Sequence, residues 1–455
     1  MPATVMWFRR DLRLADNPAL VAAVEAARAD DAEVVGLYVL DDALWSAAGA
    51  NRLAYLVDSL AALDAACGGR LVLRRGDPRS VVPDVARAVG AREVHAAASH
   101  EPRGRRRDEA VRAVLAERDA ELVETGSAYA VSPGRLRTGG GTPYRVFTPF
   151  RQAWLDHGWR APAHRPREIP WAALRSEDPP RATPTAERLP RAGEDAARRR
   201  WHAFLREGLA GYDEARDRPD LAGTSAMSVH LRWGEVHPRT LLADLAAADA
   251  PGSDVASYRS ELAWREFHAD VLHHRPGART ESLRDVVPDD AWATGPAADA
   301  AFEAWAAGRT GYPLVDAGMR QLRATGWMHN RVRMVVASFL VKDLHLHWRR
   351  GAAHFMAHLV DADVSQNQLN WQWVAGTGYD AAPYFRVFNP VTQARKFDPE
   401  GDYVRRWVPE LRGVAGRAVH EPWRLDAAPA GYPDRMVDHA HERRVALDDF
   451  SRARG

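Results

Sequence analysis

The first 130 residues alternate between short apolar segments and alanine-rich segments of helical character, and this alternation restricts the fold more than any other feature. The apolar segments are 5–8, 33–40, 70–77, 93–99 and 121–127. Strands that alternate with helices predict a parallel sheet with helices on both faces. We therefore expect residues 1–130 to form an α/β domain with a five-stranded, doubly wound parallel sheet.

The composition changes after this alternating region. No G-x-G-x-x-G sequence follows the first apolar segment, so an ordinary dinucleotide site is not expected, although a ligand can bind at the carboxyl ends of parallel strands. From Ser132 the chain is rich in turn-forming residues, and 161–195 is crowded with proline, arginine and alanine. We interpret 131–195 as an interdomain linker and 196–455 as an all-α domain.

Charge and cysteine content exclude several classes of protein. The chain has 62 Lys+Arg and 61 Asp+Glu, so any nucleic-acid surface must be a local patch. The single cysteine excludes a disulfide framework and a cysteine-based metal site. Histidines with helical spacing lack a third ligand nearby, so no metal is expected. No apolar run could span a bilayer, and charges at Arg9 and Arg10 come too early for a signal peptide. We expect a soluble, cytoplasmic protein.

Residues 326–373 concentrate polar and aromatic side chains at helical spacing. The first half predicts one long helix with a polar and aromatic face formed by Trp327, Asn330, Arg331, Met334 and Ser338. The second half brings together two carboxylates, an amide and two indoles, at Asp361, Asp363, Asn367, Trp371 and Trp373. This combination is typical of a pocket for a large, flat, hydrogen-bonding ligand. A buried pair of aromatic helices is the alternative for either half alone.

Two upstream segments add groups of the same kind. Hydroxyls follow Gly223 at a predicted helix start, at Thr224, Ser225 and Ser228. Such a start either binds an anion or is an ordinary helix cap. Further along, SYRSELAWREFH places four side chains on one helical face, at Glu261, Trp264, Arg265 and His268. Glu261 and Arg265 have the spacing of an i,i+4 ion pair, which a solvated helix also explains.

Several motifs resemble the photolyase/cryptochrome family. They are GYPLVDAGMRQLRATGWMHNRVRM, WQWVAGTGYDAAPYFRVFNP, FDPEGDYVRRWVPEL and the N-terminal WFRRDLRLADNPAL. The resemblance covers essentially the whole chain. It implies an α/β domain, a long linker and a C-terminal helical domain that holds FAD in a U-shape. By motif, the FAD contacts would be Tyr212, Thr224, Ser225, Ser228, Arg265, Asp361, Asp363 and Asn367. Ala226 stands where the family usually has arginine, which removes a cation near the cofactor.

Within the family, the chain resembles class I cyclobutane pyrimidine dimer photolyases most closely. Their HNR-x-R-M run is present at 329–334. The (6-4) photolyases have a His-His pair there, and plant cryptochromes usually carry aspartate in place of Asn367 and add a long tail. DNA repair is therefore favoured, and a blue-light-sensing cryptochrome without repair activity is the alternative. A plain flavin-binding electron carrier would explain fewer residues.

The resemblance also implies a mechanism. Fully reduced FAD absorbs light and donates an electron to a pyrimidine dimer in ultraviolet-damaged DNA, which splits and returns it. The dimer must leave the duplex to reach the site. The groups expected to act on it are Glu261, Asn330, Met334 and Asn367, where Asn367 would face flavin N5. The groups expected to hold DNA are Arg216, Trp264, Arg331, Trp373, Arg386 and Lys396. The two tryptophans of that set would stack on the dimer.

Two accessory features follow from the family as well. An electron-transfer chain would run from Trp371 through Trp348 to Trp292 at the surface, and Trp305 is the alternative exit. An antenna chromophore would bind in or beside the α/β domain. The folate branch has an Asn-Glu pair where this chain has Arg103 and Gly104. We therefore favour 8-hydroxy-deazaflavin over methenyltetrahydrofolate, with an empty site as the other alternative. We also expect a monomer.

Overall fold

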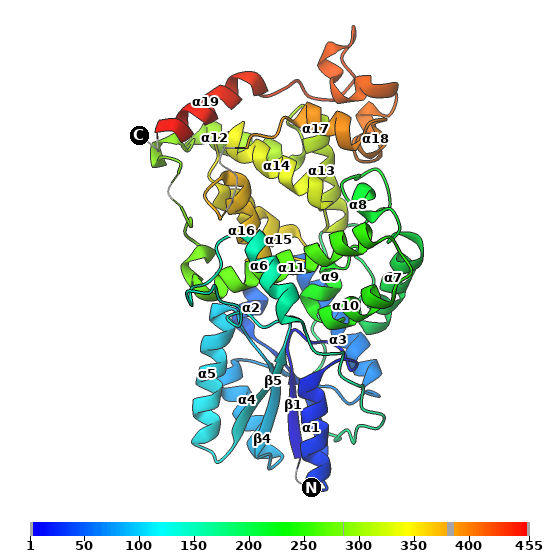
Figure 1. Ribbon diagram of the computed structural model, residues 1–455, viewed down its shortest axis with the longest axis vertical. Helices are drawn as coiled ribbons and strands as arrows, with labels where there is room; N and C mark the ends of the chain where they lie inside the picture. The colour runs from blue at the N-terminus through cyan, green and yellow to red at the C-terminus, as the bar shows by residue number, and fades with distance from the viewer. Residues whose placement is uncertain (1–2, 285, 380–385, 453–455) are drawn as a thin grey trace.

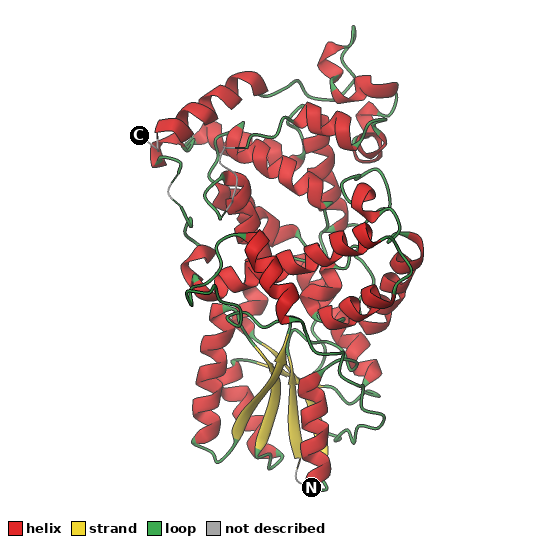
Figure 2. Ribbon diagram, in the orientation of Figure 1, coloured by secondary structure: helices red, strands yellow, loops and turns green. Residues whose placement is uncertain are grey.

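A computed structural model describes residues 3–284, 286–379 and 386–452. An α/β part contains the N-terminus, and a larger helical part lies beyond it (Figures 1 and 2). The strands run toward the helical part, so their carboxyl ends face it (Figure 1). This edge of a parallel sheet is where polar loops gather.

The sheet has five parallel strands in the order β3-β2-β1-β4-β5. The strands are β1 (Ala3–Phe8), β2 (Glu33–Leu40), β3 (Val72–Arg75), β4 (Glu93–Ala98) and β5 (Glu121–Ser127). Side chains of β1 alternate between two cores: Met6 and Phe8 pack on one face, and Val5 and Trp7 on the other. Both faces of the sheet are therefore buried, which confirms the predicted doubly wound fold.

Five helices accompany the strands. They are α1 (Pro18–Ala29), α2 (Asp42–Ala47), α3 (Ala50–Ala66), α4 (Pro78–Ala88) and α5 (Pro102–Ala116). Helices α1 and α3 contribute Leu20 and Leu60 to one core, whereas α4 and α5 contribute Val82 and Leu115 to the other. The interval between β5 and the helical part contains α6 (Phe147–His157), and Trp171 forms a β-bridge with Val34 of β2.

The remaining chain is helical. Its first group of elements is α7 (Glu194–Glu207), α8 (Tyr212–Ala215), α9 (Ser228–Trp233), α10 (Pro238–Ala247), α11 (Gly252–His274), η1 (Pro276–Arg279) and η2 (Asp289–Ala291). The second is α12 (Pro296–Ala307), α13 (Pro313–Thr325), α14 (Asn330–Lys342), α15 (Trp348–His358) and α16 (Val364–Ala375). The last is α17 (Pro390–Phe397), α18 (Asp402–Trp407), η3 (Pro409–Leu411), η4 (Gly416–His420), η5 (Pro422–Arg424) and α19 (His439–Arg452).

The prediction of one long helix in the first half of 326–373 is wrong. Two helices, α14 and α15, are separated by a short connection in which His345 has φ 50°. A left-handed non-glycine residue breaks the helical hydrogen-bond pattern. Trp327 precedes α14, which is capped by the His329 side chain accepting from the Arg331 N–H. Ser338 is fully buried and accepts from the Phe388 N–H.

Helix α9 joins the two parts of the molecule. Its Val229 and Trp233 pack in the same core as Met6 and Phe8 of β1. At Gly234 a Cβ atom would lie 1.9 Å from the Arg10 carbonyl oxygen, and the residue has φ 68°. Both the left-handed backbone and the close approach require glycine. The loop after β1 is therefore fixed directly beneath the helical part.

Candidate functional site

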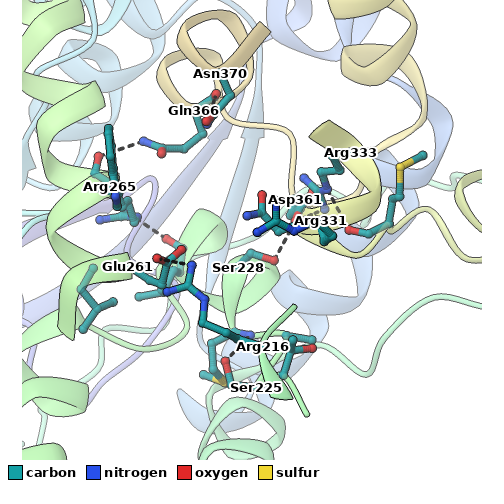
Figure 3. Close-up of a pocket in the computed structure, with 18 of the residues that line it drawn as sticks. Arg216, Ser225, Ser228, Glu261, Arg265, Arg331, Arg333, Asp361, Gln366 and Asn370 are labelled. Atoms are coloured by element: carbon teal, nitrogen blue, oxygen red, sulfur yellow. Dashed lines mark hydrogen bonds and ion pairs between the residues drawn. The ribbon is translucent and has the colours of Figure 1, made fainter. Parts of the chain in front are cut away.

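A cavity of about 430 Å³ opens between the helices. Its walls come from α8, α9, α11, α14, α16 and the segments before α9 and α16 (Figure 3). Most side chains that the sequence singled out line it, namely Tyr212, Arg216, Thr224, Ser225, Ser228, Glu261, Trp264, Arg265, Asn330, Arg331, Met334, Asp361, Asp363 and Trp373. The helical part thus gathers residues from 212 to 373 around one space.

We divide the cavity by the exposure of its charged groups. The inner end is defined by Ser228, Arg333, Asp361 and Asp363; the two carboxylates have side-chain exposures of 2% and 6%. The outer end is defined by Arg216, Asp217, Glu261, Trp264, Arg331 and Trp373. There, Arg216 and Glu261 are 25% and 32% exposed. The carboxylates of the inner end are thus much less accessible to water than those of the outer end, whereas the arginines of the two ends are similarly exposed.

Asp361 has one paired and one unpaired oxygen. Its Oδ2 accepts from Ser228 Oγ at 2.7 Å and from Arg333 Nη2 at 2.9 Å (Figure 3). Its Oδ1 is buried and has no hydrogen-bond partner among the described residues. A buried carboxylate oxygen without a partner is costly. The inner end therefore offers a strong, oriented acceptor to a ligand that carries a donor.

Asp363 is used differently. Its Oδ1 caps α16 by accepting from the backbone N–H of Ser365 and Gln366. Its Oδ2 accepts from Arg10, which also pairs with Glu101 at the start of α5. Burial alone would raise the pKa of Asp363, but the nearby guanidinium of Arg10 holds it well below its usual range. The carboxylate ties α16 to the sheet edge and at the same time lines the inner end.

The predicted ion pair between Glu261 and Arg265 does not form. Glu261 Oε1 instead accepts from Arg216 Nη2 at 2.7 Å, across 45 residues of chain. Arg265 donates to the backbone oxygens of Ala128 and Leu231 because its side chain points toward the sheet edge. Burial raises the pKa of Glu261, and the pairing with Arg216 offsets only part of that rise. Glu261 is therefore a carboxyl biased toward protonation at the outer end.

A second ion pair stands beside the first. Arg331 donates from Nε and Nη2 to the two oxygens of Asp217, at 3.2 and 2.7 Å. Asn330 is exposed and Met334 half-buried on the same helix. Partly exposed ion pairs contribute little stability and exchange readily with other anions. Both arginines of the outer end can therefore transfer their charge from a carboxylate to an incoming phosphate.

The segment before α9 forms one side of the inner space. Ser225 Oγ shares a hydrogen bond with Tyr258 OH at 2.8 Å. Ala226 has φ 48°, a left-handed conformation that a non-glycine residue rarely adopts. The segment stays irregular until α9 begins at Ser228, later than the helix start expected at Thr224. Burial raises the pKa of Tyr212 and of Tyr258, so both phenols remain neutral donors.

Two tryptophans are half-buried walls of the cavity. The Trp264 ring stacks on Phe147 with a centroid distance of 3.6 Å and an interplanar angle of 8°. The Trp373 ring has the Arg386 guanidinium over it at 5.0 Å. Arg386 thus lies beside the cavity, whereas Lys396 is exposed on α17 with its Nζ 5.0 Å from the Phe397 ring. Neither cation is part of the cavity lining.

Asn367 and the three tryptophans predicted for electron transfer are not among the described residues that line the cavity. The Asn367 amide donates to the Ala352 carbonyl at 3.0 Å, so its approach to flavin N5 stays a prediction. The Trp371 ring is 6.3 Å from Trp305, and both are buried. The His347 ring is 4.8 Å from Trp292 and 5.8 Å from Trp348.

Sequence reasoning missed several lining residues. They include Asp217, Arg232, Tyr258, Gln366 and Asn370. Asp217 directly follows Arg216, which the sequence had already singled out. Gln366 and Asn370 are polar and have i,i+4 spacing within α16. Extending the prediction to polar neighbours of the predicted site residues would have found all three. Arg232 had no such signal in the sequence. It is held at the cavity because its Nε donates to the carbonyl of Ala362, 130 residues away, at 2.7 Å.

The described residues contain neither a metal-binding cluster nor a membrane-spanning helix. No group of three or more histidine, cysteine, aspartate or glutamate side chains there is arranged to hold a metal ion. Among the helices that the structure describes, none is long and apolar enough to cross a membrane.

Two family models match the chain. Residues 4–169 match the model described as DNA photolyase, and residues 258–452 match the FAD binding domain of DNA photolyase. The second match includes the helices α11, α14 and α16 that form much of the cavity.

Curated relatives match over the full length. A deoxyribodipyrimidine photo-lyase of Streptomyces griseus is 45% identical, with 100% of each chain covered. A protein of that name from Halobacterium salinarum is 39% identical, with 99% of each chain covered. Another from Escherichia coli is 37% identical, with 100% of this chain and 99% of its own covered. The similarity therefore includes the α/β part, the helical part and the segment that connects them.

Solved structures agree with this fold. A class III photolyase from Agrobacterium tumefaciens has a TM-score of 0.91 at 37% identity and covers 100% of this chain and 98% of its own. A Synechocystis cryptochrome has a TM-score of 0.89 at 27% identity, covering 98% and 99%. An archaeal photolyase from Sulfolobus tokodaii, described with two FAD molecules, has a TM-score of 0.83 at 28% identity, covering 99% and 100%.

Proposed function

This chain belongs to the DNA photolyase family, and from that premise we propose that it uses light to split cyclobutane pyrimidine dimers in ultraviolet-damaged DNA. One observation carries the proposal beyond the family match: the cavity has two chemically different ends. The buried inner end presents an unpartnered carboxylate oxygen, and the open outer end presents two indoles, a carboxyl group and exchangeable arginines.

The inner end fits FAD. Asp361 Oδ1 is a buried acceptor without a partner, and the flavin and ribityl groups carry N–H and O–H donors. Ser228 and Arg333 hold its other oxygen, so the acceptor cannot turn away. Around the same space, Tyr212, Thr224, Ser225, Arg265 and Asp363 supply the hydroxyls and charges that the family uses toward FAD. When bound and reduced, FAD supplies the light-excited electron that enters the dimer and returns after the ring opens.

The outer end fits a flipped dimer. Trp264 and Trp373 offer indole surfaces on which two pyrimidines can stack. Glu261 lines the same end beside Arg216, and its raised pKa lets it donate a proton to a pyrimidine carbonyl. Met334 supplies an apolar contact and Asn330 an amide for a base edge. Arg216 and Arg331 hold the phosphates, with Arg386 and Lys396 farther along the same path.

Light-dependent repair tests this function. Purified protein with reduced FAD is mixed with ultraviolet-irradiated DNA and illuminated with blue light, and the remaining dimers are counted. We expect dimers to disappear under illumination and to persist in the dark. FAD binding and photoreduction without any loss of dimers would overturn repair and favour a light-sensing cryptochrome.

A chain of tryptophans supports reduction of the bound FAD. We assign Trp371, Trp348 and Trp292 to it in order toward the surface, because the His347 ring closes the interval between Trp348 and the half-buried Trp292. Trp305 is fully buried and its Nε1 donates to the Val336 carbonyl, so it does not reach solvent itself. Trp371→Phe should abolish photoreduction of oxidised FAD by an external thiol. Repair after chemical reduction should persist, and photoreduction at the normal rate would remove Trp371 from the chain.

The sheet edge fits a second chromophore, which we assign as 8-hydroxy-deazaflavin. A Cβ atom at Gly104 would lie 1.9 Å from Ser99 Oγ, so the glutamate of the folate branch has no room there. Arg52 is 7% exposed and its Nε is without a partner among the described residues, which suits a hydroxylated or anionic ligand. Absorption by protein from its native host tests the assignment. A visible band beyond that of FAD supports it, and a near-ultraviolet folate band contradicts it.

The proposal keeps the three-part division into 1–130, 131–195 and 196–455, with the catalytic cavity in the last part. It also describes the protein as a cytoplasmic monomer. Light scattering of the FAD-loaded protein tests the monomer: a mass near 50.4 kDa is expected, and twice that mass contradicts it.

A further inference from the structure

The segment between the sheet and the helical part supplies a ring that packs behind Trp264 of the outer end. Phe147, the first residue of α6, stacks on Trp264 of α11 at 3.6 Å between centroids and 8° between planes. An indole has two faces, and the Phe147 ring lies parallel against one of them. Trp264 therefore presents only its other face and its edge to the cavity.

Helix α6 holds Phe147 firmly in place. Phe150 is 2% exposed, and its ring lies 5.2 Å from Phe267 of α11. Trp154 is fully buried and donates from Nε1 to Glu266 Oε2 at 2.6 Å. Both contacts join α6 to the helix that carries Trp264. The phenyl ring is therefore mounted on a rigid pair of helices rather than on a free loop.

The remaining neighbours of Trp264 leave it little freedom. The Phe267 ring meets it edge-on at 5.7 Å, and His268 lies at 5.4 Å with the rings tilted by 44°. With Phe147 against one face, the half-buried indole is contacted by three rings and also lines the cavity. A side chain that is ordered before binding loses less conformational entropy when the ligand arrives.

Among the described residues, no aromatic ring stacks on Trp373, the other indole of the outer end. Trp373 is contacted by the Arg386 guanidinium at 5.0 Å, a cation–π contact rather than a parallel aromatic stack. The two walls therefore differ: Trp264 is held by an aromatic ring from a distant segment, and Trp373 by a cation.

From this geometry we propose that Phe147 is a positioning residue for damage recognition. It holds Trp264 in the orientation that stacks on a flipped dimer, and so makes the segment 131–195 part of the specificity of the enzyme. The inference rests on the proposed function, because it assigns the outer end to a pyrimidine dimer. Phe147 touches neither the cavity nor, by this account, the DNA.

The test measures dissociation constants of FAD-loaded Phe147→Ala for irradiated and unirradiated duplexes of one sequence. An aromatic stack is worth about 0.5–1.5 kcal/mol, so binding to irradiated DNA should weaken about 2- to 10-fold. Binding to unirradiated DNA, FAD content and photoreduction should be unchanged. Phe147→Tyr, which keeps the ring, should restore the preference for damage. Val146→Ala is the matched control, since Val146 is exposed and adjacent.

Equal weakening on both duplexes, or no weakening at all, would overturn the proposal. A second readout does not depend on DNA. In protein labelled with 5-fluorotryptophan, the Trp264 fluorine resonance is identified by its absence in Trp264→Phe. It should be a single sharp line in the wild type and become broad or split in Phe147→Ala. An unchanged line contradicts the positioning role, whereas a wild type without preference for irradiated DNA contradicts the proposed function itself.

Discussion

The inner and outer ends of the cavity contain the same kinds of charged side chain but fix them differently. At the inner end, Asp363 is 95% buried and has both oxygens occupied by α16 and Arg10, so nothing in solution competes for it. At the outer end, the pairs Arg216–Glu261 and Arg331–Asp217 are partly exposed. Buried pairs fix geometry, whereas exposed pairs can be exchanged. Under the proposed function, this difference separates an end that retains FAD from an end that binds and releases DNA.

Acid should destabilise the fold around the cavity before it protonates Asp363 at the inner end. Burial lowers the pKa of His268 and of His329 from 6.5 to about 4. The unfolded chain therefore binds more protons between those values, and stability declines as the pH falls from 6.5 to 4. The cost is on the order of 3 kcal/mol per histidine. Asp363 keeps its charge throughout, because its pKa is depressed.

Thermal unfolding and FAD fluorescence across this pH range measure the effect. We expect the unfolding temperature and FAD retention to fall together below pH 6.5, and His268→Gln to flatten the dependence. A stability profile that is level down to pH 4 would show that the histidines do not titrate on unfolding.

Asp361→Asn should have the largest effect among substitutions. It removes the charge of the buried acceptor, and a hydrogen bond to a charged group contributes roughly 1.5–3 kcal/mol, so FAD should bind about 10- to 100-fold more weakly. Equilibrium dialysis of FAD measures the change. Asp217→Asn, at the outer end, is the matched control and should retain FAD fully. If both variants lose FAD affinity equally, the inner end is not a separate FAD site and the distinction between the two ends is wrong.

Glu261→Gln should separate repair from cofactor binding. FAD should remain bound, and the number of dimers split per absorbed photon should fall about 3- to 10-fold, because the amide cannot supply a proton to a pyrimidine carbonyl. Repair under blue light with a counted photon dose measures it. Glu214→Gln, an exposed change on nearby α8, should repair normally. If Glu261→Gln repairs at the wild-type yield, then dimer splitting does not require a proton from Glu261.

Arg331→Gln should have the smallest effect. One phosphate contact is lost, so DNA binding weakens for every sequence and the slope of log K against log salt falls by about 1. Asp217→Asn should act in the opposite direction, because it frees Arg331 from its competing carboxylate. Fluorescence titrations at several salt concentrations compare the two. Weaker binding in both would mean that the ion pair itself holds the outer end in shape.

Local patterns predicted the sheet and most of the cavity, but contacts between distant residues were not predictable. The strands followed from alternating apolar segments, and Trp264 and Glu261 from helical spacing. The partner of Glu261 is 45 residues away, at Arg216, although the spacing favoured Arg265. The break at His345 depends on a left-handed residue that no apolar pattern marks. Asp363 was expected to face FAD, and its use as a cap and interdomain partner became visible only in three dimensions.

The central claim is that the outer end brings a dimer within electron-transfer distance of FAD at the inner end. The excited-state lifetime of the reduced flavin tests it most directly. The lifetime is measured with the protein alone, with an undamaged oligonucleotide and with the same oligonucleotide carrying one thymine dimer, at saturating concentrations. We predict that only the dimer shortens the lifetime, because it alone accepts the electron. An unchanged lifetime with the dimer-containing oligonucleotide bound would contradict the account.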